Sequence, residues 1–109
     1  MAVLTPQAVS LAGINPTYAS AAGGGDKVAP GERTFLHVKN GAASPITVTL
    51  TATATVRGQS VANLTVSVPA SGERMIGPLP GDLLASPSDG LVAIGYSSAT
   101  TVTVAALRI

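Results

Sequence analysis

The only histidine in the chain, His37, is the first candidate for a catalytic or metal-binding group. It stands in the alternating stretch TFLHVKN and would share one face of a strand with Phe35 and Lys39. A general base or a metal site needs further ligands or a carboxylate within reach. The chain has no cysteine, and no carboxylate lies close to His37 in sequence. We therefore interpret His37 as an ordinary strand residue, on the surface or half-buried.

The carboxylates are few and do not form a recognisable site. Asp82 and Asp89 flank a loop rich in Pro and Ser, but their spacing matches no calcium-binding loop, and Asp is common in turns. Two Glu-Arg pairs, at 32–33 and 73–74, each begin an expected strand, where charges usually protect the strand end. The serines have no base near them in sequence. We predict that the chain is not an enzyme and binds no cofactor or metal.

Two short motifs resemble a modification site and a phosphate-binding site only in part. Asn63-Leu64-Thr65 matches a glycosylation acceptor, but this three-residue pattern is weak and matters only in a secreted eukaryotic protein. The GGGD run at 23–26 lacks the lysine, the helix and the preceding strand of a phosphate-binding loop. Neither motif predicts a site.

The composition predicts one domain with an aliphatic core. Of 109 residues, 46% are hydrophobic but only 3% are aromatic, and there is no tryptophan. A domain of this length hides roughly 65% of its unfolded surface, which is enough for one modest core. Since small side chains bury less area each, we expect modest stability and a gain from any partner that covers more surface.

Charged residues make up only 10% of the chain, against about a quarter in typical domains. The net charge is +1 and the basic residues form no cluster, so we expect no nucleic-acid partner. No stretch is apolar for long enough to span a membrane, and the first residues lack the charged start of a signal peptide. Such low charge suits a chain that works inside an assembly, although an uncharged soluble β domain is the alternative.

Alternating apolar and polar residues predict an all-β fold. The clearest segment is ITVTLTATATV, residues 46–56, with aliphatic side chains on one face and only threonines on the other. No segment has a helical period. We predict an antiparallel β-sandwich, Ig-like or jelly-roll-like, over residues 33–109. Its other strands are expected at 33–40, 61–69, 73–79, 91–98 and 100–109.

The threonine face of 46–56 has several interpretations. Ice-binding surfaces use threonine ladders but need several stacked strands, and no solenoid repeat is present. Carbohydrate-binding sandwiches prefer Trp or Tyr platforms, and this chain offers only Tyr18 and Tyr96. The simplest interpretation is that threonine suits a half-exposed pleated surface.

Residues 1–32 are predicted to form an extended N-terminal arm or first strand. This region carries no charge before Asp26 and is interrupted by prolines and by the glycine run at 23–25. Its apolar side chains need a surface to cover: the chain's own domain, a neighbouring subunit or another protein. The candidate partner-binding residues are Val3, Leu4, Val9, Leu11, Ile14 and Tyr18.

Four stretches give the chain a family resemblance: INPTYASAAGGGDKV, RTFLHVKNGAASPITVTL, TVSVPASGERMIGPLP and VTVAALRI. Together they resemble small β-rich capsid decoration (cement or head) proteins of tailed bacteriophages, which are encoded beside the major capsid protein. The similarity extends over nearly the whole chain. Its most distinctive parts, RTFLHVKN and SVPASGERMIGP, are fold motifs and not catalytic ones.

The resemblance implies a structural virion protein made in the host bacterial cytoplasm and placed on the outer capsid surface. Its partner would be the major capsid protein, with self-association on the capsid, and with neither nucleic acid nor a membrane involved. It would brace the joints between capsomers in many copies. Two alternatives remain: a low-copy head-completion, neck or tail protein, and a ligand-binding β-sandwich outside any virus.

Overall fold

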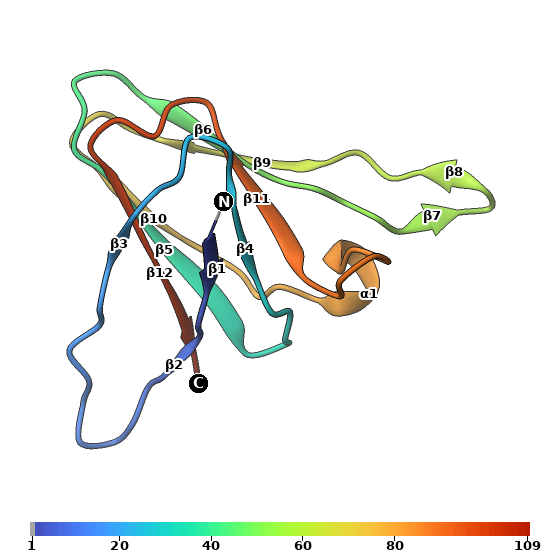
Figure 1. Ribbon diagram of the computed structural model, residues 1–109, viewed down its shortest axis with the longest axis horizontal. Helices are drawn as coiled ribbons and strands as arrows, with labels where there is room; N and C mark the ends of the chain where they lie inside the picture. The colour runs from blue at the N-terminus through green and yellow to red at the C-terminus, as the bar shows by residue number, and fades with distance from the viewer. Residues whose placement is uncertain (1) are drawn as a thin grey trace.

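The computed structural model describes residues 2–109 and consists mostly of β-strands, which confirms the predicted all-β class. Figure 1 shows the strands gathered into one body, from which a hairpin and a loop extend. The only helix in residues 2–109 is the four-residue α1. The elements are β1 (Ala2–Leu4), β2 (Gln7–Ala8), β3 (Ala19–Ser20), β4 (Asp26–Val28), β5 (Thr34–Asn40), β6 (Ile46–Leu50), β7 (Thr55–Val56), β8 (Gln59–Ser60), β9 (Leu64–Val68), β10 (Glu73–Ile76), α1 (Gly81–Leu84), β11 (Val92–Tyr96) and β12 (Val102–Arg108).

The strands form two main sheets and one separate hairpin. The first sheet has the order β1-β4-β11-β6-β9, and the second has the order β10-β5-β12-β2 with β3 also paired to β12. Most neighbours are antiparallel, as predicted, but β1 runs parallel to β4 and β2 runs parallel to β12. The prediction of purely antiparallel sheets is wrong for these two pairs. Parallel neighbours need a long connection, and β1 and β4 are joined through the whole segment that contains β2 and β3.

The core is aliphatic and takes side chains from both sheets. Leu36 and Val38 of β5 alternate with outward-facing residues, and Val48 and Leu50 of β6 do the same in the other sheet. Val104 of β12 belongs to the same core and is fully buried. This agrees with a composition rich in Val, Leu and Ile and almost without aromatic residues.

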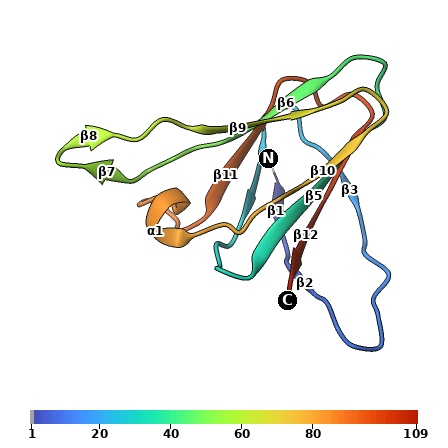
Figure 2. The ribbon, with the colours of Figure 1, turned by 180° about the vertical axis from the view of Figure 1, so that it is seen from behind.

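The threonine segment 46–56 is not one strand. β6 ends at Leu50, residues 51–54 belong to no strand, and Thr55–Val56 pairs only with Gln59–Ser60. The resulting β7–β8 hairpin extends far from the body in both views (Figures 1 and 2). Its two-residue turn has positive φ at both Arg57 and Gly58, as type I′ turns require. The registers with β11 and β9 end at Leu50, and after one further hydrogen bond, from the Thr51 amide to the Ala93 carbonyl, residues 52–56 have no neighbouring strand of the body to pair with.

The segment 1–32 contributes strands to both sheets. β1 and β4 lie in the first sheet, while β2 and β3 pair with β12 in the second. Leu4, Ala21 and Val28 of this segment belong to the core. Between β2 and β3 the chain leaves the sheets as a projecting loop (blue in Figure 1).

Candidate functional site

The outward face of the second sheet carries aromatic, apolar and charged side chains. Along β5, Phe35, His37 and Lys39 point away from the core. On the neighbouring strand β10, Met75 stands opposite His37 and Glu73 stands opposite Lys39. This face therefore presents an apolar part and a polar part side by side.

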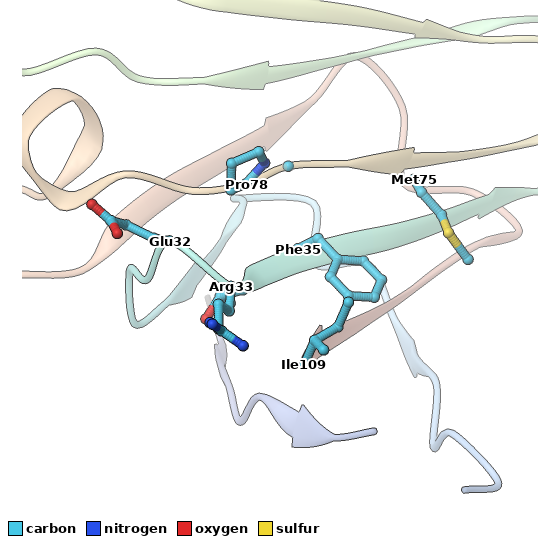
Figure 3. A pocket seen from close by; sticks show the side chains of 8 residues that line it. Glu32, Arg33, Phe35, Met75, Pro78 and Ile109 are labelled. Carbon is cyan, nitrogen blue, oxygen red and sulfur yellow. The ribbon is translucent and has the colours of Figure 1, made fainter. Parts of the chain in front are cut away.

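The apolar part is a hollow of about 320 Å³, here named the Phe35–Met75 hollow. Figure 3 shows the Phe35 ring beside Ile109, with Met75 further along β10. Met75 and Ile109 have relative exposures of 65% and 70%, although both are large apolar side chains. The remaining lining residues are Glu32, Arg33, Thr34, Gly77 and Pro78.

Gly77 allows the chain to pass close to the floor of this hollow. A Cβ atom at Gly77 would lie 2.5 Å from Cβ and 2.9 Å from Cα of Phe35. No real side chain tolerates such a distance, so the residue that follows β10 must lack a Cβ. The close approach keeps Pro78 against the hollow.

Two adjacent charges of opposite sign stand at the rim of the hollow. Glu32 and Arg33 are both exposed. Within residues 2–109, Lys27 pairs with Asp89 and Glu73 contacts His37, and neither rim charge forms an ion pair. The rim thus offers one positive and one negative group to an approaching surface.

The polar part of the face is a chain of contacts centred on His37. The Tyr18 hydroxyl lies 2.6 Å from Nδ1 of His37, and Nε2 lies 3.1 Å from Oε1 of Glu73. The Lys39 ammonium lies 4.1 Å from the centre of the Tyr18 ring, within range of a cation–π contact. A neutral imidazole satisfies both partners if Nδ1 accepts from Tyr18 and Nε2–H donates to Glu73.

The placement of His37 agrees with the sequence in one respect and differs in two. It shares its face with Phe35 and Lys39, as the alternation predicts. It is buried, because Tyr18 packs edge-on against its ring. Its carboxylate partner, Glu73, comes from the neighbouring strand and so could not be found from sequence distance.

A hydroxyl, an imidazole and a carboxylate in this order resemble an activated nucleophile. Tyr18, His37 and Glu73, however, line neither the Phe35–Met75 hollow nor a second hollow beside β12, so the three groups do not open onto either. We interpret the Tyr18–His37 and His37–Glu73 contacts as structural: they hold Tyr18 and the segment before it against the second sheet.

The segment before Tyr18 is a loop with a closed base. The Gln7 side chain donates to the carbonyl of Thr17 (2.9 Å) and accepts from the Thr17 amide (2.8 Å). Residues 9–16, here named the Leu11 loop, extend from this base. A turn in which the Gly13 amide donates to the carbonyl of Ser10 (2.9 Å) lies near the middle of the loop. Leu11 stands within this turn with a relative exposure of 108%.

The six predicted partner-binding residues fall into three groups. Leu4 is a buried residue of the core. Ile14 and Tyr18 are half-buried. Val3, Val9 and Leu11 are exposed, and the last two belong to the Leu11 loop.

The second hollow, of about 380 Å³, lies between the first residues of the chain and β12. The polar side chains of Thr5, Gln7 and Thr17 line it together with Val3 and the stretch 104–106. Gln7 also belongs to the base of the Leu11 loop, so this hollow adjoins the point where the loop begins.

The two aspartates considered as calcium ligands lie in different surroundings. Asp89 is 2.5 Å from the Lys27 ammonium and accepts a hydrogen bond from the Leu91 amide. Asp82 lies in the first turn of α1. Within residues 2–109, no three His, Asp or Glu side chains gather closely enough to hold a metal ion. No helix in this part of the chain has the length and apolarity needed to cross a membrane.

Comparison with protein-family models, curated proteins and solved structures finds no match to this chain.

Proposed function

We propose that this chain is a structural virion protein that binds the outside of a bacteriophage capsid and stabilises contacts between capsomers. The sequence resemblance to capsid decoration proteins motivates this function. The structural observation that supports it best is the Leu11 loop, an uncharged projection with a fully exposed leucine in its turn. An exposed apolar side chain on a projecting loop is suited to fill a pocket on another protein.

In this proposal Leu11 and Val9 insert between subunits of the shell. Burying one leucine side chain contributes roughly 1.5–3 kcal/mol, which is weak for a single contact. Many copies on one shell reinforce each other, so weak individual contacts suffice. The low charge of the chain limits repulsion between crowded copies.

We also propose that the two sheets are the layers of a β-sandwich, with residues 1–32 as the region that contacts the capsid. Within this region the Leu11 loop carries two of the three exposed candidate residues, Val9 and Leu11, whereas Leu4 and Val28 are core residues. Deleting the whole region would therefore remove part of the core. A clean variant replaces residues 9–16 by a short Gly-Ser linker and keeps β2 and β3.

The first experiment is quantitative mass spectrometry of purified virions of the phage that encodes the chain. A copy number equal to that of the major capsid protein, or a simple fraction of it, would support decoration. A handful of copies would favour a head-completion, neck or tail protein. Absence from the particle would overturn the virion assignment and direct attention to ligand binding.

The second experiment measures binding of the purified chain to shells assembled without it. The Leu11→Ser variant should lose most of its binding, because the contact depends on one apolar side chain. Val56→Ser is the matched control, since Val56 is also exposed (64%) but lies on the β7–β8 hairpin. Equal binding by both variants would contradict the proposed role of the loop.

A further inference from the structure

The Phe35–Met75 hollow is an apolar surface that the chain leaves open. Phe35, Met75 and Ile109 line it, and the last two are more than half exposed. Contiguous apolar surface of this kind marks a site of protein contact more often than scattered exposed residues do.

The rim of the hollow narrows the choice of partner. Glu32 and Arg33 are consecutive, exposed and of opposite sign, so the charges of these two rim side chains cancel. A strongly basic or acidic partner would find one attractive and one repulsive group there. A surface with the same pair in the reverse order would match both groups.

We propose that the Phe35–Met75 hollow is the contact between two copies of this chain related by a two-fold axis. In such an interface the same patch is used on both sides and must be complementary to itself. The apolar centre satisfies this condition, and so do the rim charges, since each Glu32 would meet the Arg33 of the second copy. Met75 contributes a flexible thioether that can adapt to an identical surface.

The contact does not depend on a capsid, so it stands or falls separately from the proposed function. A patch centred on a few side chains is smaller than a standard stable interface, which predicts a weak dimer in solution. The same dimer would be strengthened wherever copies are held close together.

The experiment is sedimentation equilibrium of the full chain over a range of concentrations. The wild-type chain should show a reversible monomer–dimer equilibrium. Met75→Glu should raise the dissociation constant of the dimer at least about tenfold, because it places a charge at the centre of the contact. Val56→Ser is the matched control, because Val56 is an exposed apolar residue (64%) on the β7–β8 hairpin, outside the hollow, and its replacement should leave the equilibrium unchanged.

Charge reversal tests the two-fold arrangement itself. Glu32→Arg alone and Arg33→Glu alone should each weaken the dimer, because like charges would then face each other. An equimolar mixture of these two single variants should dimerise again, since every facing pair is then of opposite sign. The double variant carrying both changes should also dimerise.

Three results would overturn the proposal: a wild-type chain that stays monomeric up to about 1 mM, a dimer that Met75→Glu leaves intact, or single charge variants that the mixture does not rescue. Met75, Glu32 and Arg33 are exposed, so their replacement should not unfold the chain. Circular dichroism and a thermal melt of each variant check this. If Met75→Glu loses both the dimer and the fold, the mixture of the two charge variants alone tests the proposal.

Discussion

The Tyr96 hydroxyl donates a 2.9 Å hydrogen bond to Oδ2 of Asp26, a carboxylate that is almost completely buried. The same oxygen accepts a 3.3 Å hydrogen bond from the Ala22 amide. The glycines at 23–25 form the turn between Ala22 and Asp26. Gly25 lies so close to β11 that a Cβ there would be 2.5 Å from the Ile94 carbonyl oxygen. The sequence GGGD therefore forms a tight turn held by a carboxylate, and Gly25 is the glycine that this turn requires.

Replacing Tyr96 by Phe should lower the free energy of unfolding by about 1–3 kcal/mol. The variant keeps the ring but removes a hydrogen-bond donor from the buried Asp26 carboxylate. The desolvation cost of this carboxylate is then offset by fewer hydrogen bonds. Urea denaturation of the two proteins measures the difference. Tyr18→Phe is a useful comparison, because Tyr18 is half-buried and its hydroxyl contacts an imidazole instead of a carboxylate. A Tyr96→Phe variant as stable as the wild type would contradict the role assigned to this bond.

Alkaline pH should destabilise the chain through the same tyrosine. Burial raises the pKa of Tyr96 well above its usual value of 10, and the hydrogen bond to Asp26 and the charge of that carboxylate raise it further. A raised folded-state pKa contributes stability that is complete below pH 10 and is lost as the pH rises above it. The free energy of unfolding should therefore fall above about pH 10 in the wild type and less steeply in Tyr96→Phe. If the free energy of unfolding falls equally steeply with pH in the two proteins, ionisation of Tyr96 is not the cause of the alkaline destabilisation.

Acid should weaken the contact between Lys27 and Asp89. The hydrogen bond from Lys27 lowers the pKa of Asp89 below its ordinary value of 3.8, with a further contribution from the Leu91 amide. A lowered folded-state pKa contributes stability that is present above pH 3.8 and disappears as the pH falls below it. The difference in melting temperature between wild type and Asp89→Asn should be small near neutral pH, because the pair is on the surface, and should vanish in strong acid. A difference that grows on acidification would contradict this assignment.

Local alternation was sufficient to predict the class of the fold and most of its strands. Residues 34–40, 64–68 and 92–96 alternate in the sequence and form strands in the structure. Alternation failed for 51–56, because it records which face a side chain prefers and not whether a neighbouring strand is present to pair with. The parallel pairing of β1 with β4 and of β2 with β12 could not be predicted from local alternation, because it depends on how segments distant in the sequence meet.

The Phe35–Met75 hollow was not predicted from the sequence. The patterns TFLHVKN and ERMI do alternate Phe35 and Met75 with core residues, but a single apolar residue on an outward face is ordinary and does not by itself mark a contact surface. What sequence could not supply is the register that brings β10 beside β5 and thereby joins His37 to Glu73. Of the predicted arm residues, Leu4 is a core residue because β1 pairs with β4 in the first sheet.

Gly77 should be intolerant of any side chain. Gly77→Ala places a methyl group on the backbone and Cβ of Phe35, where the neighbouring atoms belong to a central strand and cannot move aside. Overpacking of this kind costs typically about 1–3 kcal/mol, and it would also displace the wall of the Phe35–Met75 hollow. Gly24→Ala is the control, because a Cβ there meets no atom within 4 Å and the change should be neutral or slightly stabilising. Thermal denaturation compares the two variants, and a Gly77→Ala chain that melts with Gly24→Ala would show that β10 is free to shift away from Phe35.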